Sequence, residues 1–321
     1  MGTNDAVRGC EVLVVGAYFA DLVFHGLAGA VRPGGEVFAE GFALVPGGAY
    51  SSAMALRRLG HDVVWSTDFG TDAFSGQVLA AARQEGLDEA AFRHHDGPVR
   101  SLTVALAADG ERAMVSFMDP VAPVPLAPVL RRHRPRVLLL PQLRCDDVAL
   151  AALDAARELG TVVVMDCHDT AVSLADPAVR RALAGVDVFT PNTAEAVRLT
   201  GAADPEAAVA ELAALVPTLV VKRGAHGATA VRDGKRHDVP AVPARVVDTT
   251  GAGDCFDAGF VHGLLAGWSL PDCLAAAAAC GAAAVTGPGS SAALRVEELH
   301  RRLGRSAARP GEPVPAAGSS S

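Results

Sequence analysis

The sequence has no excess of positive charge, because 28 Lys and Arg stand against 36 Asp and Glu, a formal net charge of −8. Proteins that bind nucleic acid over a wide surface need clustered Lys and Arg, so this balance argues against a nucleic-acid partner. The chain also lacks any run of about 18 apolar residues and any apolar signal core in Met1–Gly9. We therefore expect no membrane partner.

Cysteine patterns typical of metal sites are absent as well. The six cysteines form no C-x-x-C pair and show no metal-like spacing with histidine, which indicates reduced thiols and a cytoplasmic protein. His94 and His95 are adjacent but have no third ligand nearby, so we assign them no function. Only 5% of the residues are aromatic while 50% are hydrophobic, so burial must come from Ala, Val and Leu in many short elements.

Short apolar runs alternate with stretches of helical spacing. The run from Glu11 to Gly16 is typical of a buried parallel strand, and Leu274–Val285 of a buried helix. Helical stretches end at Gly160 and Gly201, residues that suit helix C-termini. This alternation predicts an α/β fold with a doubly wound, mostly parallel sheet flanked by helices. The other predicted strands and the two helical stretches are Val137–Leu140, Thr161–Met165, Val186–Phe189, Thr218–Val221, Asp147–Leu159 and Thr193–Thr200.

Two segments interrupt this rhythm and predict a small β-lid inserted at about residues 31–46 and 98–118. In the second segment, alternating runs flank Asp109-Gly110, a hairpin signal. The main domain is expected to span 10–305. Residues 306–321 are rich in Pro, Gly, Ala and Ser, so we expect a disordered tail there.

The strongest chemical signal is the string Asp-Thr-Thr-Gly-Ala-Gly-Asp-Cys-Phe-Asp-Ala-Gly-Phe over 248–260. Gly251, Ala252 and Gly253 present backbone N–H groups at the start of a predicted helix, where an anion such as a transferring phosphoryl group is favoured. Asp254 in the first turn is ionised near neutral pH and can accept the proton of an attacking hydroxyl. The alternative is an ordinary glycine turn with Asp254 as a helix cap.

This string matches the C-terminal signature of the ribokinase-like family of carbohydrate kinases, also called the PfkB family. The chain resembles that family over roughly residues 11 to 300. The resemblance implies a ribokinase-like fold and a kinase that uses ATP and Mg²⁺ to phosphorylate a hydroxyl of a sugar-like small molecule. Five further segments resemble the family's motifs in their usual order: Val14–Gly16 with Asp21, Pro46–Gly60, Asp68–Phe74, Thr190–Glu195 and Val221–Gly227.

The resemblance also implies a role for each motif. Asp21, just past the first strand, would accept sugar hydroxyls, and Gly47-Gly48 would flex as the lid closes; a solvated acid and a plain tight turn are the alternatives. Asn192 and Glu195 would hold Mg²⁺, largely through water; the alternative is that they only cap a helix. The nucleotide would be bound by Asn192, Lys222, Gly224 and Gly227. A K⁺ ion would be bound by Asp248, Thr250, Ala284, Gly287 and Gly289.

Two departures from the ribokinase pattern concern the acceptor. Ser52 stands where the family signature usually has asparagine, and Arg144 stands where ribokinase has glutamate. If both side chains contact the substrate, the acceptor is not ribose and carries an anionic group that Arg144 binds. The alternative is that Arg144 points to solvent or pairs with Asp146 or Asp147.

Other functions fit the sequence less well. There is no G-x-x-x-x-G-K-[ST] string for a P-loop kinase and no G-x-G-x-x-G after Gly16 for a nicotinamide oxidoreductase. A nucleoside kinase of the same family and a non-catalytic sugar- or nucleotide-binding protein on the same fold stay open, although the intact Asp254 speaks against the latter. The sequence also leaves open whether two lids pair in a homodimer.

Overall fold

The structure, a computed structural model, describes residues 9–108, 111–168 and 171–305. Three expectations concern parts of the chain outside these residues: most of the N-terminal segment, the hairpin tip at Asp109-Gly110, and the tail 306–321.

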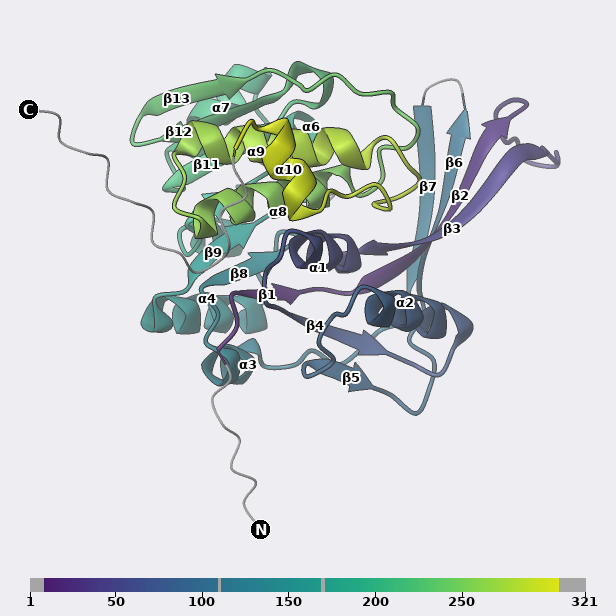
Figure 1. The fold of residues 1–321 in the computed structure, drawn as a ribbon, viewed down its shortest axis with the longest axis horizontal. Helices are drawn as coiled ribbons and strands as arrows, with labels where there is room; N and C mark the ends of the chain where they lie inside the picture. The colour runs from purple at the N-terminus through teal and green to yellow at the C-terminus, as the bar shows by residue number, and fades with distance from the viewer. Residues whose placement is uncertain (1–8, 109–110, 169–170, 306–321) are drawn as a thin grey trace, which may run out of the picture.

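A nine-stranded sheet forms the centre of the molecule in the order β13-β12-β11-β10-β9-β8-β1-β4-β5 (Figure 1). The strands from β11 to β5 pair in parallel, and β12 and β13 extend one edge as antiparallel strands. The prediction of a mostly parallel sheet is confirmed. Its strands are β1 (Val12–Val15), β4 (Val63–Phe69), β5 (Phe92–His94), β8 (Val137–Leu140), β9 (Val162–Met165), β10 (Val188–Phe189), β11 (Thr218–Lys222), β12 (Ala228–Arg232) and β13 (Lys235–Val239).

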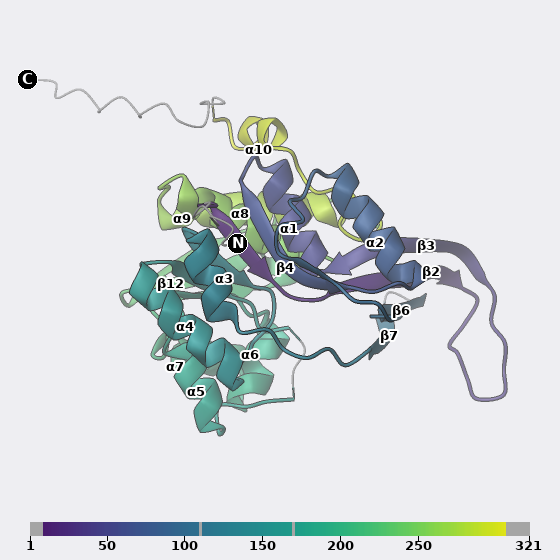
Figure 2. The ribbon, with the colours of Figure 1, turned by 90° about the horizontal axis from the view of Figure 1, so that it is seen from below.

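Helices cover both faces of this sheet, as expected for a doubly wound fold (Figure 2). One face carries α1 (Ala49–Arg58), α2 (Ala73–Gln84), α8 (Ala252–Leu265), α9 (Leu270–Ala284) and α10 (Val296–Arg302). The other face carries α3 (Leu126–His133), α4 (Asp147–Leu159), α5 (Pro177–Leu183), α6 (Thr193–Thr200) and α7 (Pro205–Ala213). Within the described residues, no helix is both long and apolar enough to cross a membrane.

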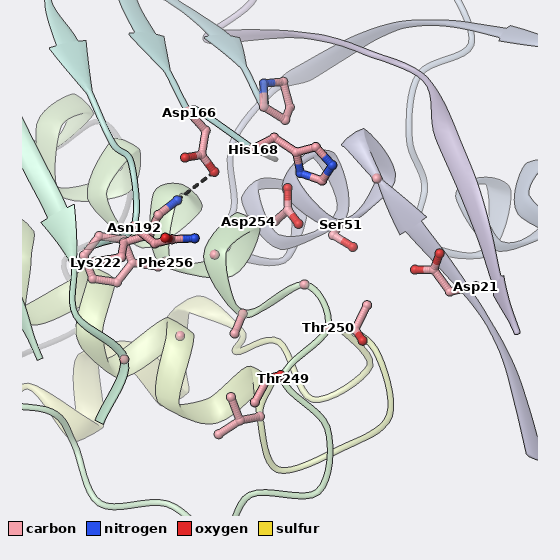
Figure 3. A pocket seen from close by; sticks show the side chains of 18 of the residues that line it. Asp21, Ser51, Asp166, His168, Asn192, Lys222, Thr249, Thr250, Asp254 and Phe256 are labelled. Carbon is pink, nitrogen blue, oxygen red and sulfur yellow. Dashed lines mark hydrogen bonds and ion pairs between the residues drawn. The ribbon is translucent and has the colours of Figure 1, made fainter. Parts of the chain in front are cut away.

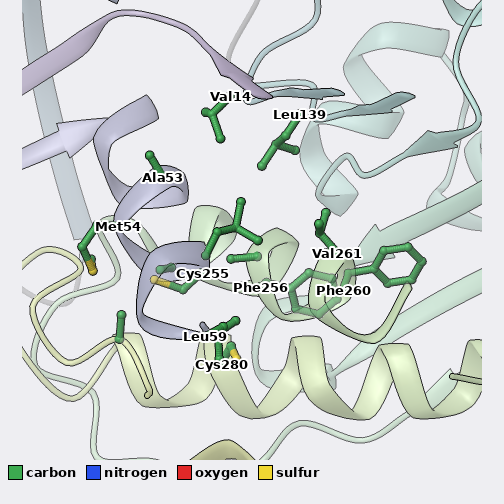
Figure 4. Packing of buried hydrophobic residues seen from close by; sticks show 14 of the residues in the cluster. Val14, Ala53, Met54, Leu59, Leu139, Cys255, Phe256, Phe260, Val261 and Cys280 are labelled. Carbon is green, nitrogen blue, oxygen red and sulfur yellow. The ribbon is translucent and has the colours of Figure 1, made fainter. Parts of the chain in front are cut away.

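The continuous apolar strands follow from this double coverage. Val14 and Leu139 point into the cluster beneath α1, α8 and α9, whereas their neighbours Leu13 and Leu138 point into the cluster beneath α3 to α7 (Figure 4). Because side chains alternate between the two faces, every position of a central strand is buried and has to be apolar.

A second, four-stranded sheet lies beside the body in the order β3-β2-β6-β7 (Figure 1). β2 pairs with β3 antiparallel and with β6 parallel, and β6 pairs with β7 antiparallel up to Ala108 and Glu111. The small sheet was predicted, but β2 was missed, and the strand expected from residue 31 begins at Ala39. Its strands are β2 (Tyr18–Leu27), β3 (Ala39–Gly48), β6 (Ser101–Ala108) and β7 (Glu111–Met118).

The predicted helix ends at Gly160 and Gly201 are confirmed, because both glycines have left-handed backbone angles at the C-caps of α4 and α6. The strand expected over Val186–Phe189 is shorter than predicted and begins at Val188, since Val186 closes the turn after α5 through a bond to Leu183. The buried helix predicted from Leu274 starts earlier, at Leu270, where Ser269 caps it.

Candidate functional site

A cavity of about 1030 Å³ lies between the small sheet and the carboxyl ends of the parallel strands (Figure 3). Gly16, Gln142 and Asp166 line it from the loops that follow β1, β8 and β9, and Thr103 and Met114 line it from β6 and β7. The carboxyl ends of parallel strands are where open α/β sheets bind their ligands. The fold therefore places this cavity where small molecules are expected to bind.

One wall of the cavity is the turn that opens α8. Gly251 is the N-cap of this helix, with φ 73°, a left-handed conformation that favours glycine, and Gly251, Ala252 and Gly253 all line the cavity. The first N–H groups of a helix have no partner within the helix, and the helix dipole adds positive potential there. The turn that was predicted to bind an anion therefore lies at the cavity wall and opens a helix there.

Asp254 follows in the first turn of α8 and also lines the cavity. Burial raises its pKa to about 6, although a hydrogen bond from Ser52 and the nearby Lys222 and His168 lower it. Asp166 acts in the same direction as burial. A carboxyl with this pKa is mostly ionised at pH 7, so it can accept a proton.

Lys222, at the end of β11, lies between two carboxylates. Its Nζ is 2.6 Å from Oδ2 of Asp166 and 3.3 Å from Oδ2 of Asp257. Burial works against the charge on Lys222, but the two aspartates outweigh burial and raise its pKa. A Cβ built on Gly253 would lie 3.4 Å from this Nζ. The ammonium group is thus held as a cation beside the anion-binding turn.

Asn192 and Glu195 form a reciprocal capping box at the start of α6. Asn192 Oδ1 accepts from the Glu195 N–H at 2.9 Å, and Glu195 Oε2 accepts from the Asn192 N–H at 2.8 Å. The capping alternative is therefore realised, yet both side chains also line the cavity. Burial, followed by the charge of Asp166, raises the pKa of Glu195, so the charged form of this carboxyl is disfavoured here and a bound cation would favour it.

The described residues contain no group of three or more His, Cys, Asp or Glu side chains arranged to hold a metal ion. Mg²⁺ keeps several waters and uses few protein ligands, so a sparse site at Glu195 and Asn192 fits its chemistry.

One part of the cavity has small, mostly apolar walls. Gly224 and Gly227 flank a short 3₁₀ turn on one side, and the segment 241–246 and α9 complete the walls with Val242, Pro243 and Gly281. Walls without bulky side chains suit a flat ring such as a nucleobase. The glycine loop that was expected to contact a nucleotide lies at this part of the cavity.

Asp21 lies at the opposite part of the cavity, within β2 of the small sheet and not just past the first strand as expected. Its side chain is buried against β3, and a Cβ built on Gly47 would lie 2.0 Å from its Oδ2. A side chain at position 47 would therefore displace this carboxylate. Gly48 lines the cavity directly, with φ 63°.

Three residues expected to contact the substrate do not line the cavity: Gly47, which backs onto Asp21, and Ser52 and Arg144. Ser52 is buried in α1 and donates a hydrogen bond to Asp254 Oδ1 at 2.8 Å. Arg144 forms an ion pair with Asp146 at 3.0 Å, the alternative that its neighbours in sequence suggested. In both cases a carboxylate engages the side chain: that of Asp254, which itself lines the cavity, for Ser52, and that of Asp146 for Arg144.

The residues expected around a monovalent cation come from two adjacent loops. Asp248 joins them, since Oδ1 accepts from the Thr250 N–H at 3.0 Å and Oδ2 from the Gly289 N–H at 2.7 Å. The Ala284 carbonyl accepts from the Gly287 N–H at 3.4 Å within the second loop. All five positions are therefore neighbours, as the resemblance implied.

Sequence reasoning missed three cavity residues, Gln142, Asp166 and His168, and it also missed the ion pair of Asp257 with Lys222. Gln142 follows β8, and Asp166 and His168 follow β9, both of which were predicted strands. The rule that ligands bind at the carboxyl ends of strands could have singled them out. Asp257 could have been noticed as a charged residue inside an otherwise apolar helix, three positions after Asp254.

Comparison with known proteins gives concordant results. The chain matches the family described as pfkB family carbohydrate kinase over residues 11–296. It is 32% identical to a fructokinase of Klebsiella pneumoniae over 286 residues, which cover 80% of this chain and 92% of that protein. A ribokinase of Haemophilus influenzae is 26% identical over 276 residues, covering 82% of this chain and 88% of that protein.

Solved structures share the fold. A ribokinase of Arabidopsis thaliana complexed with ribose and ATP has a TM-score of 0.78 at 24% identity, covering 93% of this chain and all of that one. A nucleoside kinase of Burkholderia thailandensis in complex with inosine has a TM-score of 0.72 at 22% identity, covering 91% and 97%. The ribokinase-like fold is thus confirmed, and because the family match spans most of the sequence, the chain belongs to the pfkB family of carbohydrate kinases.

Proposed function

We propose that this carbohydrate kinase transfers the γ-phosphoryl group of ATP to a hydroxyl of an uncharged sugar, with Asp254 as the general base. The observation that carries the proposal is the position of Asp254, which follows the anion-binding turn of α8 and lines the same cavity as Asp21 (Figure 3). A base and an anion site are the two elements that phosphoryl transfer to an alcohol requires of the protein.

In the proposed reaction, the acceptor hydroxyl gives its proton to the Asp254 carboxylate as its oxygen bonds to the γ-phosphorus. The bond from that phosphorus to the bridging oxygen breaks, and ADP leaves with the electron pair. The N–H groups of Gly251, Ala252 and Gly253 and the ammonium of Lys222 stabilise the negative charge on the phosphoryl oxygens. Buried charges and dipoles held in place before the reaction need little reorganisation during it.

The nucleotide base would occupy the part of the cavity beside Gly224, Gly227 and Val242. Glu195 and Asn192 would hold Mg²⁺, largely through water, and this ion neutralises phosphate charge when bound. We also propose that the loops of Asp248 and Gly289 bind K⁺ through backbone carbonyls. These assignments rest on the residues that line the cavity and on the nearness of the Asp166 charge to Glu195.

The proposed acceptor is uncharged because of the side chains near Asp21. Among the described residues that line the cavity, Lys222 is the only Lys or Arg, and Asp166 and Asp257 already engage it. A carboxylate or phosphate on the acceptor would find no cation at the small sheet. This proposal replaces the expectation of an anionic acceptor, and since Ser52 and Arg144 do not line the cavity, ribose is no longer disfavoured.

We further propose that the small sheet closes over the acceptor by movement near Gly47-Gly48, which would exclude water and suppress ATP hydrolysis.

The outward face of the small sheet exposes several apolar side chains, including Phe42, Val115 and Phe117, and would suit pairing with a second copy of the chain. A cytoplasmic location, in keeping with six free thiols, completes the proposal.

The test is a coupled assay of ADP release over a panel of neutral sugars, sugar acids, sugar phosphates and nucleosides. We expect turnover with at least one neutral sugar, no turnover after exhaustive chelation, and recovery on adding Mg²⁺. A sugar acid or sugar phosphate as the best acceptor would contradict the uncharged acceptor. A nucleoside as the best acceptor would favour the nucleoside kinase alternative, and binding without turnover would refute catalysis.

A further inference from the structure

The first turn of α1 contains two consecutive buried serines that bond to different partners. Ser51 Oγ donates to Ser290 Oγ at 3.0 Å, in the loop after α9, and Ser51 lines the cavity. Ser52 Oγ donates instead to Asp254 Oδ1 at 2.8 Å, and Ser52 does not line the cavity. The two serines thus share one helix turn and similar burial but only Ser52 contacts the proposed base.

The direction of the Ser52 bond follows from chemistry. An ionised carboxylate can only accept hydrogen bonds, so the serine hydroxyl must donate its proton to Asp254. Hydrogen bonds to a charged oxygen are stronger than those between neutral groups. The bond therefore favours the charged carboxylate over the neutral acid, and it occupies Oδ1 while Oδ2 remains to receive a proton.

We propose that Ser52 is a positioning residue that orients the Asp254 carboxylate and keeps it in its charged form. The proposal rests on the base role of Asp254 given above. Ser52 acts through Asp254 and does not touch the acceptor, because it lies in the packed contact between α1 and α8. This role differs from the direct substrate contact that the sequence pattern suggested for this position.

The electrostatics of Asp254 give such a donor a role. Burial and Asp166 both raise the pKa of Asp254, and the Ser52 bond is the largest of the effects that lower it, before those of Lys222 and His168. Without the bond, less of the carboxyl would be ionised near pH 6 and its oxygens would be free to rotate. A serine that only fills space in the helix contact would leave the protonation of Asp254 unchanged.

The experiment compares the dependence of kcat/KM on pH for the wild type, Ser52→Ala and Ser52→Cys. The acidic limb of this profile reports the pKa of the base in the free enzyme. Loss of a hydrogen bond to the charged form should move that limb upward by about one pH unit in Ser52→Ala. Ser52→Cys keeps the volume with a weaker donor, so a smaller upward shift is expected.

Ser51→Ala is the matched control, because it removes a buried hydroxyl from the same helix turn without touching Asp254. Its acidic limb should stay at the wild-type position, whatever its maximal rate. The acceptor KM of Ser52→Ala at high pH should stay near the wild-type value, since Ser52 does not line the cavity. An acidic limb that stays in place in Ser52→Ala, or that moves equally in Ser51→Ala, would overturn the proposal.

Asp254→Asn separates this inference from the proposed function. If Asp254→Asn is inactive and Ser52→Ala keeps the wild-type limb, Asp254 is the base but Ser52 does not position it. If Asp254→Asn turns over like the wild type, the base assignment itself is wrong and the Ser52 proposal falls with it. Thermal unfolding of each variant shows whether a lost rate reflects an unfolded protein.

Discussion

The two sheets of this protein are built from the same kinds of residue but are buried very differently. In the large sheet, β1 and β8 are buried at every position, between two layers of helices. In the small sheet, β7 turns Met114 and Ser116 toward the cavity while Val115 is 68% exposed. The large sheet is therefore stabilised by its own core, whereas one face of the small sheet is available for ligands and the other for solvent.

This difference divides the work of the site. Asp254, Lys222 and the anion-binding turn all belong to the buried body, where packing fixes their geometry. Asp21 and Thr103, which line the cavity where the acceptor is proposed to bind, belong to the small sheet. Phosphoryl transfer needs fixed groups, whereas acceptor choice tolerates a sheet that can shift. Each of the following predictions tests this division.

The largest effect is expected at the base. Asp254→Asn keeps the shape of the side chain but removes its ability to take a proton, so kcat should fall about 10²- to 10⁴-fold. Steady-state kinetics with a sugar accepted in the screen will measure the fall. Because Asp254 is also held by Ser52, circular dichroism should confirm an intact fold. A variant with wild-type turnover would show that the body does not supply the base.

The second prediction contrasts the stability of the two sheets. Leu139→Ala in β8 removes a fully buried side chain and should lower the free energy of unfolding by about 2–5 kcal/mol. Val115→Ala in β7 removes an exposed side chain and should change it by less than about 1 kcal/mol. Urea unfolding of both variants measures the difference. Equal losses would mean that the small sheet is as firmly packed as the body.

The same contrast explains what the sequence could predict. The body strands are short apolar runs bounded by turn residues, and runs such as Val137–Leu140 were predicted at their observed ends. β2 was missed because Tyr18–Leu27 follows β1 after only two residues and mixes apolar residues with Asp21, so it resembles a loop. Tertiary contacts with β3 and β6, not local pattern, make it a strand.

The candidate site divides in the same way. The turn at Gly251–Asp254 and the capping pair of α6 are local in sequence, so residue types alone predicted them. The bond from Ser52 to Asp254 joins positions 202 apart, and Lys222 meets Asp166 across 56 positions. Side-chain partners at such separations depend on how helices and strands pack. Position in the motif singled out Ser52, but it did not indicate the bond to Asp254 that the structure shows.

The third prediction concerns the junction between the sheets, where β3 leads directly into α1. Gly48 has φ 63° and ψ −145°, and a Cβ there would lie 2.7 Å from the Ala17 carbonyl oxygen. Gly48→Ala should therefore lower the free energy of unfolding by about 1–3 kcal/mol. Gly47→Ala is the informative partner, because its Cβ would instead displace the Asp21 carboxylate and should raise the acceptor KM. Urea unfolding and acceptor kinetics on both variants would separate the two effects, and identical behaviour would contradict this assignment.

The smallest expected effect concerns a histidine cluster in the helical layer of the body. His262 of α8 lies between His61, at 2.9 Å, and His300, at 3.4 Å, and packs edge-on against Trp268. Burial, followed by the neighbouring histidines, lowers the pKa of His262 to about 3. His262 is thus neutral in the folded protein at pH values where the unfolded chain would already carry the proton.

The sign of the effect follows from proton binding. Between the ordinary histidine pKa of about 6.5 and the folded pKa of about 3, only the unfolded state holds a proton at His262, so acid favours unfolding. From pH 7 to pH 5 this residue should lower the free energy of unfolding by about 2 kcal/mol, with less than 1 kcal/mol lost by pH 6. The raised pKa of Asp254 acts in the opposite direction, since its folded carboxyl holds a proton more tightly than the unfolded one.

The difference in the free energy of unfolding between wild type and His262→Gln therefore isolates the histidine. This difference should shrink as the pH falls, because the variant lacks the acid-sensitive group. Urea titrations followed by tryptophan fluorescence suit the measurement, since Trp65 and Trp268 both lie in the body. Parallel loss of stability with pH in the two proteins would show that the acid sensitivity of the body arises elsewhere.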